Sequence, residues 1–211
     1  MSHFLASTKP LFAAFLVSTF VSAFSQTSTS SSPGLASGWD DSGNVSVSDD
    51  IRATAGTLIL TTTPVLMARE LNFSIPSDHV IEGIQVDIER SRATGFLAGN
   101  VQDITVRLTK DGSTLIGDNK AKAGNWPTSD GYTSYGGNTD LWGVSWTADE
   151  INSSTFGIRI ETYQNSGLWA SSEIDHIRIT VYHHLAVVPI TLTAFDAKLA
   201  TTGSVRLTWT T

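Results

Sequence analysis

Long stretches of the chain alternate apolar and polar residues with a period of two. This period is typical of a β-strand that buries one face and exposes the other. It is clearest in four segments, at residues 80–90, 104–109, 156–161 and 177–182. The inward-facing residues of these segments should form one buried core. They are Ile84, Val86, Ile88, Ile104, Val106, Leu108, Ile158, Ile160, Ile177, Ile179 and Val181.

Less regular strands are predicted between Gly, Pro and Asp turn residues, at residues 57–62, 65–73, 113–117 and 141–146. The Asp111-Gly112 pair predicts a tight hairpin turn of type I′. Thr147 is placed to cap a single helical turn. Seven or eight strands with long connections predict an all-β fold, and specifically a jelly-roll-like β-sandwich.

The first 25 residues have the layout of a secretory signal peptide. His3 and Lys9 make its start weakly basic, an apolar run follows at residues 11–21, and cleavage after Ser25 would leave Gln26 as the new N-terminus. The apolar run is shorter than the about 20 residues that span a bilayer. We therefore expect a secreted or cell-surface protein whose mature chain has no membrane span.

Composition divides the rest of the chain into three parts. Residues 26–37 are rich in Ser and Thr and predict a flexible spacer, and residues 38–184 hold the sandwich domain. Residues 185–211 predict a linker and two more strands. Because two strands do not make a stable sheet alone, we expect this segment to be an incomplete second β module of a longer protein.

Charge and cysteine content exclude several functions. The chain has 20 acidic against 13 basic residues, and a net charge of −7 without a basic stripe disfavours nucleic acid as a partner. It has no cysteine, which rules out disulfides and thiolate metal sites, so an apolar core must stabilise the fold. We expect no cofactor.

Calcium is the one metal that the sequence leaves open. The hard cation binds six to eight oxygen ligands, and one acidic loop could offer some of them. Its spacing matches no EF-hand, however, and a solvated acidic loop is the favoured interpretation. The acidic and amide residues of the loop are Asp40, Asp41, Asn44, Asp49 and Asp50.

Aromatic residues gather between Asn125 and Trp146 among Gly, Asn, Ser and Asp. Flat rings with polar neighbours are typical of a sugar-binding platform, but a long loop can also use its rings as a small core of its own. The second interpretation is favoured, with Trp142 and Trp146 expected to be buried. The candidate ligand-binding residues are Trp126, Tyr132, Tyr135, Asp130 and Asn125, of which Trp126 and Tyr132 should be exposed if sugar binds.

Catalytic patterns are weak. The nearest carboxylate pair, Asp87 and Glu89, is expected to form cross-strand ion pairs on the outer faces with Arg90, Arg107 and Arg159. The nucleophile motif G-x-S-x-G is absent, and Asp175 and His176 alternate on one strand and so point to opposite faces. We expect a protein without catalytic activity.

Two segments resemble known families. The tail VVPITLTAFDAKLATTGSVRLTWTT resembles the start of the fibronectin-like segment that precedes type IX sorting domains in secreted proteins of the Bacteroidota. The body, with LNFSIPSD, VIEGIQVDIERS, DITVRLTKDG and YGGNTDLWG, resembles a β-sandwich module of bacterial exported proteins and phage structural proteins. The resemblance implies a fold and an exported location but no activity.

The first hypothesis is therefore a non-catalytic structural or adhesive β-sandwich module of an exported, cell-surface bacterial protein. The alternative is a carbohydrate-binding module that uses the aromatic loop. A second alternative is an accessory domain of a secreted hydrolase whose catalytic part lies outside this chain. The expected partner is a polysaccharide or another surface protein.

Overall fold

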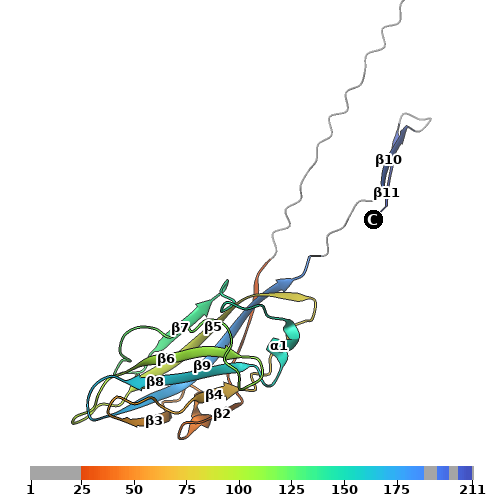
Figure 1. The fold of residues 1–211 in the computed structure, drawn as a ribbon. Coiled ribbons are helices and arrows are strands. Elements are labelled where there is room, and N and C mark those ends of the chain that lie inside the picture. The colour runs from red at the N-terminus through yellow and green to blue at the C-terminus, as the bar shows by residue number, and fades with distance from the viewer. Residues whose placement is uncertain (1–24, 188–193, 200–203, 211) are drawn as a thin grey trace, which may run out of the picture.

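The computed structural model describes residues 25–187, 194–199 and 204–210, and in it two antiparallel β-sheets pack face to face (Figure 1). The predicted all-β sandwich is confirmed. The segment predicted as a signal peptide lies outside the described residues, except for Ser25.

The larger sheet is organised around one long strand, β9 (Trp169–Leu185). On one side β9 pairs with β5 (His79–Arg92), which pairs in turn with β7 (Tyr132–Gly137). On the other side two short strands lie end to end along β9. They are β1 (Thr27–Ser31), beside its C-terminal half, and β3 (Ala53–Leu58), beside its N-terminal half.

The second sheet has the order β2 (Leu35–Ser37), β4 (Leu66–Arg69), β8 (Gly157–Gln164) and β6 (Val101–Thr109). In both sheets a strand from the end of the domain lies between strands from its first half. The segment at residues 116–126 follows the outer edge of β6, where its backbone nitrogens donate to β6 carbonyls. This interleaved order, with a reduced strand after β6, is that of a jelly roll.

Three short elements complete the structure. A 3-10 turn, η1 (Ser42–Val45), precedes β3, and α1 (Ala148–Asn152) begins at Thr147 with the predicted cap. Beyond the sandwich, β10 (Ala194–Leu199) and β11 (Val205–Thr210) pair as an antiparallel hairpin. Val188, Pro189 and Ile190, which belong to the fibronectin-like resemblance, lie outside the described residues.

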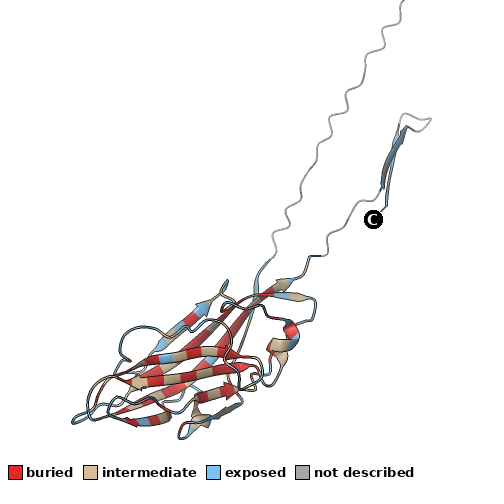
Figure 2. Cartoon of the chain, in the orientation of Figure 1, coloured by how far each residue is buried: buried red, intermediate tan, exposed pale blue. Residues whose placement is uncertain are grey.

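The predicted core is buried between the sheets, as Figure 2 shows along β5, β6, β8 and β9. Every predicted core residue is buried except Ile104, which is 42% exposed. The exception has a local cause. Asp103 pairs with Thr162 while Thr105 pairs with Glu161, so Ile104 is the extra residue of a β-bulge. A bulge reverses the faces of a strand, and here it turns Asp103 inward.

The prediction of a flexible spacer at residues 26–37 is wrong, because this segment holds two strands of the sandwich, β1 and β2. Thr27–Ser31 forms β1, paired with β9 from His183 to Ile179. Hydroxyl groups add to the backbone pairing, since Thr29 Oγ1 lies 3.1 Å from His183 Nε2 and Ser30 Oγ lies 2.8 Å from Thr180 Oγ1. An edge strand needs no apolar face, because cross-strand polar pairs can stabilise it.

Three smaller predictions also fail. Residues 113–117 form no strand and contribute only a bridge between Ile116 and Leu108. The Asp111 carboxylate accepts hydrogen bonds from the backbone nitrogens of Ser113 and Thr114, at 2.8 and 2.7 Å, and closes an Asx-type turn where a type I′ turn was expected. Residues 141–146 are turns, not a strand.

Within the described ranges, no helix is long and apolar enough to cross a membrane.

Candidate functional site

The aromatic segment at residues 125–146 turns most of its rings inward. Trp142 and Trp146 are buried as predicted. Trp126 is only 2% exposed and Tyr135 only 1%, so Trp126 lacks the exposure that sugar binding would require. Tyr132, at 46%, is the one ring of the segment that water reaches widely. The segment therefore lacks the side-by-side pair of exposed rings that sugar stacking requires.

The reason for this burial is a carboxylate inside the sandwich. Asp103 Oδ1 accepts hydrogen bonds from Arg90 and from Trp126 Nε1, the latter at 2.7 Å. Asp103 Oδ2 accepts from Tyr135 Oη at 2.8 Å and from the backbone nitrogen of Lys122 at 2.9 Å. We call Arg90, Asp103, Trp126 and Tyr135 the Asp103 cluster.

Arg90 binds the same rings through its positive charge. Its guanidinium carbon lies 4.7 Å from the Trp126 ring centre and 5.6 Å from that of Tyr135. Burial raises the pKa of Tyr135, and the charge of Asp103 raises it further, so the phenol stays a neutral donor. Each polar group of the Asp103 cluster has a partner, which is what a buried ion pair requires.

The other candidate residues are separated from this cluster. Asp130 pairs with Arg52, whose Nε lies 2.7 Å away. Burial acts to raise the pKa of Asp130, but the hydrogen bonds from Arg52 and Ser91 and the charge of Arg52 together lower it. Asn125 accepts a hydrogen bond from Asn165 at 2.7 Å, and Tyr132 Oη lies 2.8 Å from His176 Nδ1. The five predicted residues do not form one binding site.

A serine and a histidine do meet, although the sequence gave little reason to expect it. Ser32 Oγ lies 2.7 Å from His176 Nε2, a distance suited to a nucleophile and its base. Burial lowers the pKa of His176 and favours the neutral, proton-accepting ring. The contact is one of a series in which side chains of residues 29–32 bind β9, so it also serves to hold this N-terminal segment in place.

The carboxylates singled out in the sequence are in structural contacts. Asp87 is buried and accepts hydrogen bonds from Ser134 at 2.6 Å and from Arg178 at 3.0 Å. Asp87 thus forms a cross-strand ion pair, but its partner is Arg178 and not the predicted Arg90, Arg107 or Arg159. Glu89 instead accepts a hydrogen bond from Ser48 at 2.7 Å. No group of three or more His, Asp or Glu side chains that could hold a metal occurs in the described part of the chain, so the acidic loop forms no such calcium site.

One end of the sandwich carries a group of exposed apolar side chains, which we call the apolar tip. They come from three loops, after β3, after β5 and before β9. Phe96 is the most exposed, at 88%. The members of the apolar tip are Leu58, Ile59, Leu60, Phe96, Leu97 and Leu168.

Backbone hydrogen bonds join the three loops of the apolar tip. The Ile59 nitrogen donates to the Leu168 carbonyl at 3.3 Å, and the Leu168 nitrogen donates to Leu97 at 3.0 Å. Trp169 Nε1 donates to the Phe96 carbonyl at 2.9 Å. The apolar side chains are thus presented together on a connected framework.

Two leucines of the tip have a backbone conformation that leucine rarely adopts. Leu60 has φ 54° and Leu97 has φ 61°, in the left-handed region that favours glycine or asparagine. Such strain is often retained at binding sites. The fold alone would be better served by other residues at both positions.

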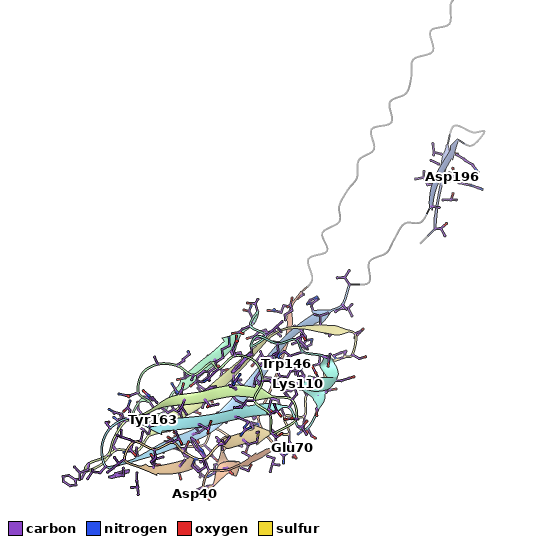
Figure 3. The ribbon with its side chains drawn as sticks, viewed as in Figure 1. Asp40, Glu70, Lys110, Trp146, Tyr163 and Asp196 are labelled. Carbon is purple, nitrogen blue, oxygen red and sulfur yellow. The ribbon has the colours of Figure 1, made fainter. Side chains whose placement is uncertain are left out.

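A cleft of about 550 Å³ opens beside the apolar tip, between the start of β9 and the loop after β3. Figure 3 shows Tyr163 toward the same end of the sandwich, and Tyr163 is the bridge partner of the cleft residue Thr62. We call it the Trp169 cleft. Its lining residues are Gly56, Thr57, Leu58, Thr61, Thr62, Trp169, Ala170 and Ser171.

Sequence reasoning missed both the apolar tip and the Trp169 cleft. The signal was present, because the ranges 53–68, 93–102 and 162–172 contain no Asp, Glu, Lys, Arg or His in an otherwise acidic chain. Ile59 and Leu60 were counted as part of a strand, whereas β3 ends at Leu58.

No protein-family model, curated protein or solved structure matches this chain. What the molecule does must therefore be argued from its own geometry.

Proposed function

We propose that this chain is a non-catalytic, adhesive β-sandwich module of an exported protein, and that the apolar tip is its contact surface. One observation carries the proposal. Trp169, hydrogen-bonded to the tip, begins β9, and Leu185 ends it, so the tip lies at the opposite end of the sandwich from Gln26 and Leu185, where the chain enters and leaves (Figure 1).

This placement suits a module that is tethered at one end and makes contact at the other. Monomeric proteins rarely expose a contiguous apolar patch without a binding role. The absence of charge in the three tip loops also removes electrostatic repulsion between an acidic protein and an anionic surface.

Export to the cell surface is part of the same proposal. Cleavage after Ser25 would leave Gln26 just before β1, so the mature chain would begin at the edge of the sheet. The carbohydrate-binding alternative loses its support in the aromatic segment, because Trp126 and Tyr135 are buried.

Attachment of protein-coated beads to a polystyrene surface tests the tip. We expect the triple variant Ile59→Thr, Phe96→Ser, Leu168→Ser to attach about tenfold less than the wild type, since each change removes exposed apolar area. The matched control is Val47→Ser, Ile51→Ser, Val80→Ser, which alters three apolar residues that are also exposed but lie elsewhere. Equal loss in both variants, or no loss in the first, would contradict the proposal.

Two further measurements test the signal peptide and the absence of catalysis by Ser32. Mass spectrometry of exported protein should find an N-terminus at or near Gln26, and an intact Met1 on exported material would exclude the signal peptide. A fluorophosphonate probe for activated serines should leave Ser32 unlabelled. Labelling that disappears in His176→Gln would instead make Ser32 a catalytic nucleophile.

A further inference from the structure

We propose that the Trp169 cleft binds an uncharged saccharide unit. The inference deepens the proposed function and rests on it, because the cleft opens beside the apolar tip and would name what this end of the module recognises. The volume of about 550 Å³ falls within the range of about 300–1,000 Å³ that is usual for small-molecule sites.

The lining combines an aromatic ring with hydroxyl groups, the two features that a sugar needs. An indole gives an apolar surface to the C–H groups of a pyranose ring, and Trp169 is held in position by its hydrogen bond to the Phe96 carbonyl. Thr57 and Thr61 donate to carbonyls of the protein, at 3.4 and 2.7 Å, and their oxygens can still accept.

Other polar groups of the cleft lack partners. The hydroxyls of Thr62 and Ser171 make no hydrogen bond to any other residue in the described ranges, and both can donate and accept. A ligand rich in hydroxyl groups would satisfy them. An acyl chain would bury them without partners, which is unfavourable.

The charge of the cleft selects the class of saccharide. None of the lining residues is charged, and neither are the loops around them. A uronic acid or a sulfated sugar would lose hydration without gaining an ion pair. A neutral sugar has no charge that must be desolvated, so hexoses or pentoses without acidic groups fit best.

Gly56 allows the cleft to be closed without damage to the fold. A Cβ atom added there meets no atom within 4 Å, and valine favours strands more than glycine does. We expect Gly56→Val to fill the cleft while the melting temperature stays the same or rises. Gly137→Val is the matched control, because Gly137 ends β7, distant in the sheet, and its added Cβ also meets nothing within 4 Å.

The measurement is affinity gel electrophoresis of the full chain against dextran, mannan, xylan, mixed-linkage β-glucan and, as the charged sample, alginate. We expect at least one neutral polysaccharide to retard the wild type, with little change between low and high salt. Gly56→Val should weaken that binding at least about tenfold, a change of about 1.4 kcal/mol, while Gly137→Val stays within about twofold.

Three results would overturn the inference. They are the absence of binding to every neutral polysaccharide, binding to alginate alone with a strong salt dependence, and equal binding by Gly56→Val and the wild type. The tip variant Ile59→Thr, Phe96→Ser, Leu168→Ser separates the two proposals. If it loses attachment to polystyrene while no polysaccharide binds, the adhesive proposal stands and the saccharide site falls. If polysaccharide binds and all variants attach to polystyrene equally, the apolar tip falls and the saccharide site stands.

Discussion

The Asp103 cluster and the apolar tip each receive a large aromatic side chain from a loop, yet the two rings are placed in opposite ways. In the cluster, Trp126 enters the sandwich and binds a buried carboxylate. In the tip, Phe96 stands in water at 88% exposure. The sequence left a binding surface open at the first as the alternative to a loop core, and its charge-free loops were the only sign of the second.

The difference shows that a loop's composition does not fix the direction of its side chains. Trp and Tyr carry polar groups that need hydrogen-bond partners when buried. The buried Asp103 carboxylate accepts hydrogen bonds from both Trp126 and Tyr135. Phe96 and Leu97 follow β5 at the rim of the sandwich. What decides burial is a partner in the interior, and Asp103 faces the interior only because of the bulge at Ile104.

The largest expected effect comes from removing the carboxylate of the cluster. Asp103→Ala should lower the free energy of unfolding by about 3–5 kcal/mol, because Arg90 is left as an unpaired buried charge. Asp130→Ala breaks a more exposed pair with Arg52 and should cost less than about 1 kcal/mol. Urea unfolding of both variants makes the comparison. Similar losses would mean that the Asp103 cluster is not special to the fold.

A ring from each region gives the next contrast. Trp126→Ala should lower stability by about 3–5 kcal/mol, since it removes a buried indole with its hydrogen bond. Phe96→Ala should change stability by no more than about 0.5 kcal/mol, because the ring is exposed. Thermal unfolding checks both. A large loss in Phe96→Ala would show that the tip stabilises the fold and would weaken its assignment as a contact surface.

Mild acid should first affect the edge of the sheet at β1, before the Asp103 cluster or the apolar tip. Burial lowers the pKa of His183, as do the charges of His79 and His184, so the unfolded chain binds more protons than the folded chain below the usual histidine pKa. Stability should therefore fall as the pH drops from about 7 to 5. We expect a fall of a few degrees in melting temperature and faster amide exchange in β1.

His183→Gln should remove part of this pH dependence, while the neighbouring His184→Gln should leave most of it. His176→Gln should remove another part, because burial also lowers the pKa of His176. The carboxylates affect stability at a lower pH than the histidines do. The pKa of Asp87 is lowered, because hydrogen bonds from Ser134 and Arg178 outweigh burial, which acts to raise it. Its contribution is lost only in stronger acid. An unchanged profile in His183→Gln would assign the acid response to other groups.

The smallest effect concerns the strained backbone of the tip. Leu97→Gly should raise stability by about 0.5–1 kcal/mol, because glycine tolerates the left-handed conformation that Leu97 adopts at φ 61°. Leu168→Gly should give no such gain, since Leu168 does not have a positive φ. Chemical denaturation of the two variants can measure this difference in the free energy of unfolding. A loss in Leu97→Gly would show that the leucine side chain stabilises the tip.

The alternation of apolar residues was sufficient to predict the sandwich and its core, because side-chain period and burial are directly linked in strands. It failed where the period was broken or absent. Ile104 was misplaced because an extra residue in one strand leaves no mark in the sequence. β1 was missed because its pattern of Ser and Thr has no apolar face, and its pairing depends on β9, about 150 residues away along the chain.

The candidate site was less predictable. The sequence showed correctly that Trp126, Tyr132 and Tyr135 are close together along the chain. The burial of Trp126 and Tyr135 depends on Asp103 and Arg90, which belong to other segments of the sequence. The apolar tip and the Trp169 cleft arise only when the loops after β3, after β5 and before β9 meet. A run of residues without charge is visible in each loop, but their meeting is not.

The strand β9 also has a mechanical consequence. Its 17 residues, at about 3.3 Å each, connect Trp169 at the cleft to Leu185, where the chain leaves the sandwich. A load applied between a bound partner and the tether would run along this strand, against the long β5–β9 ladder. Hydrogen bonds loaded in this shear direction must break together, whereas a peeled edge loses them one by one. We therefore expect the module to resist pulling along β9 better than pulling across it.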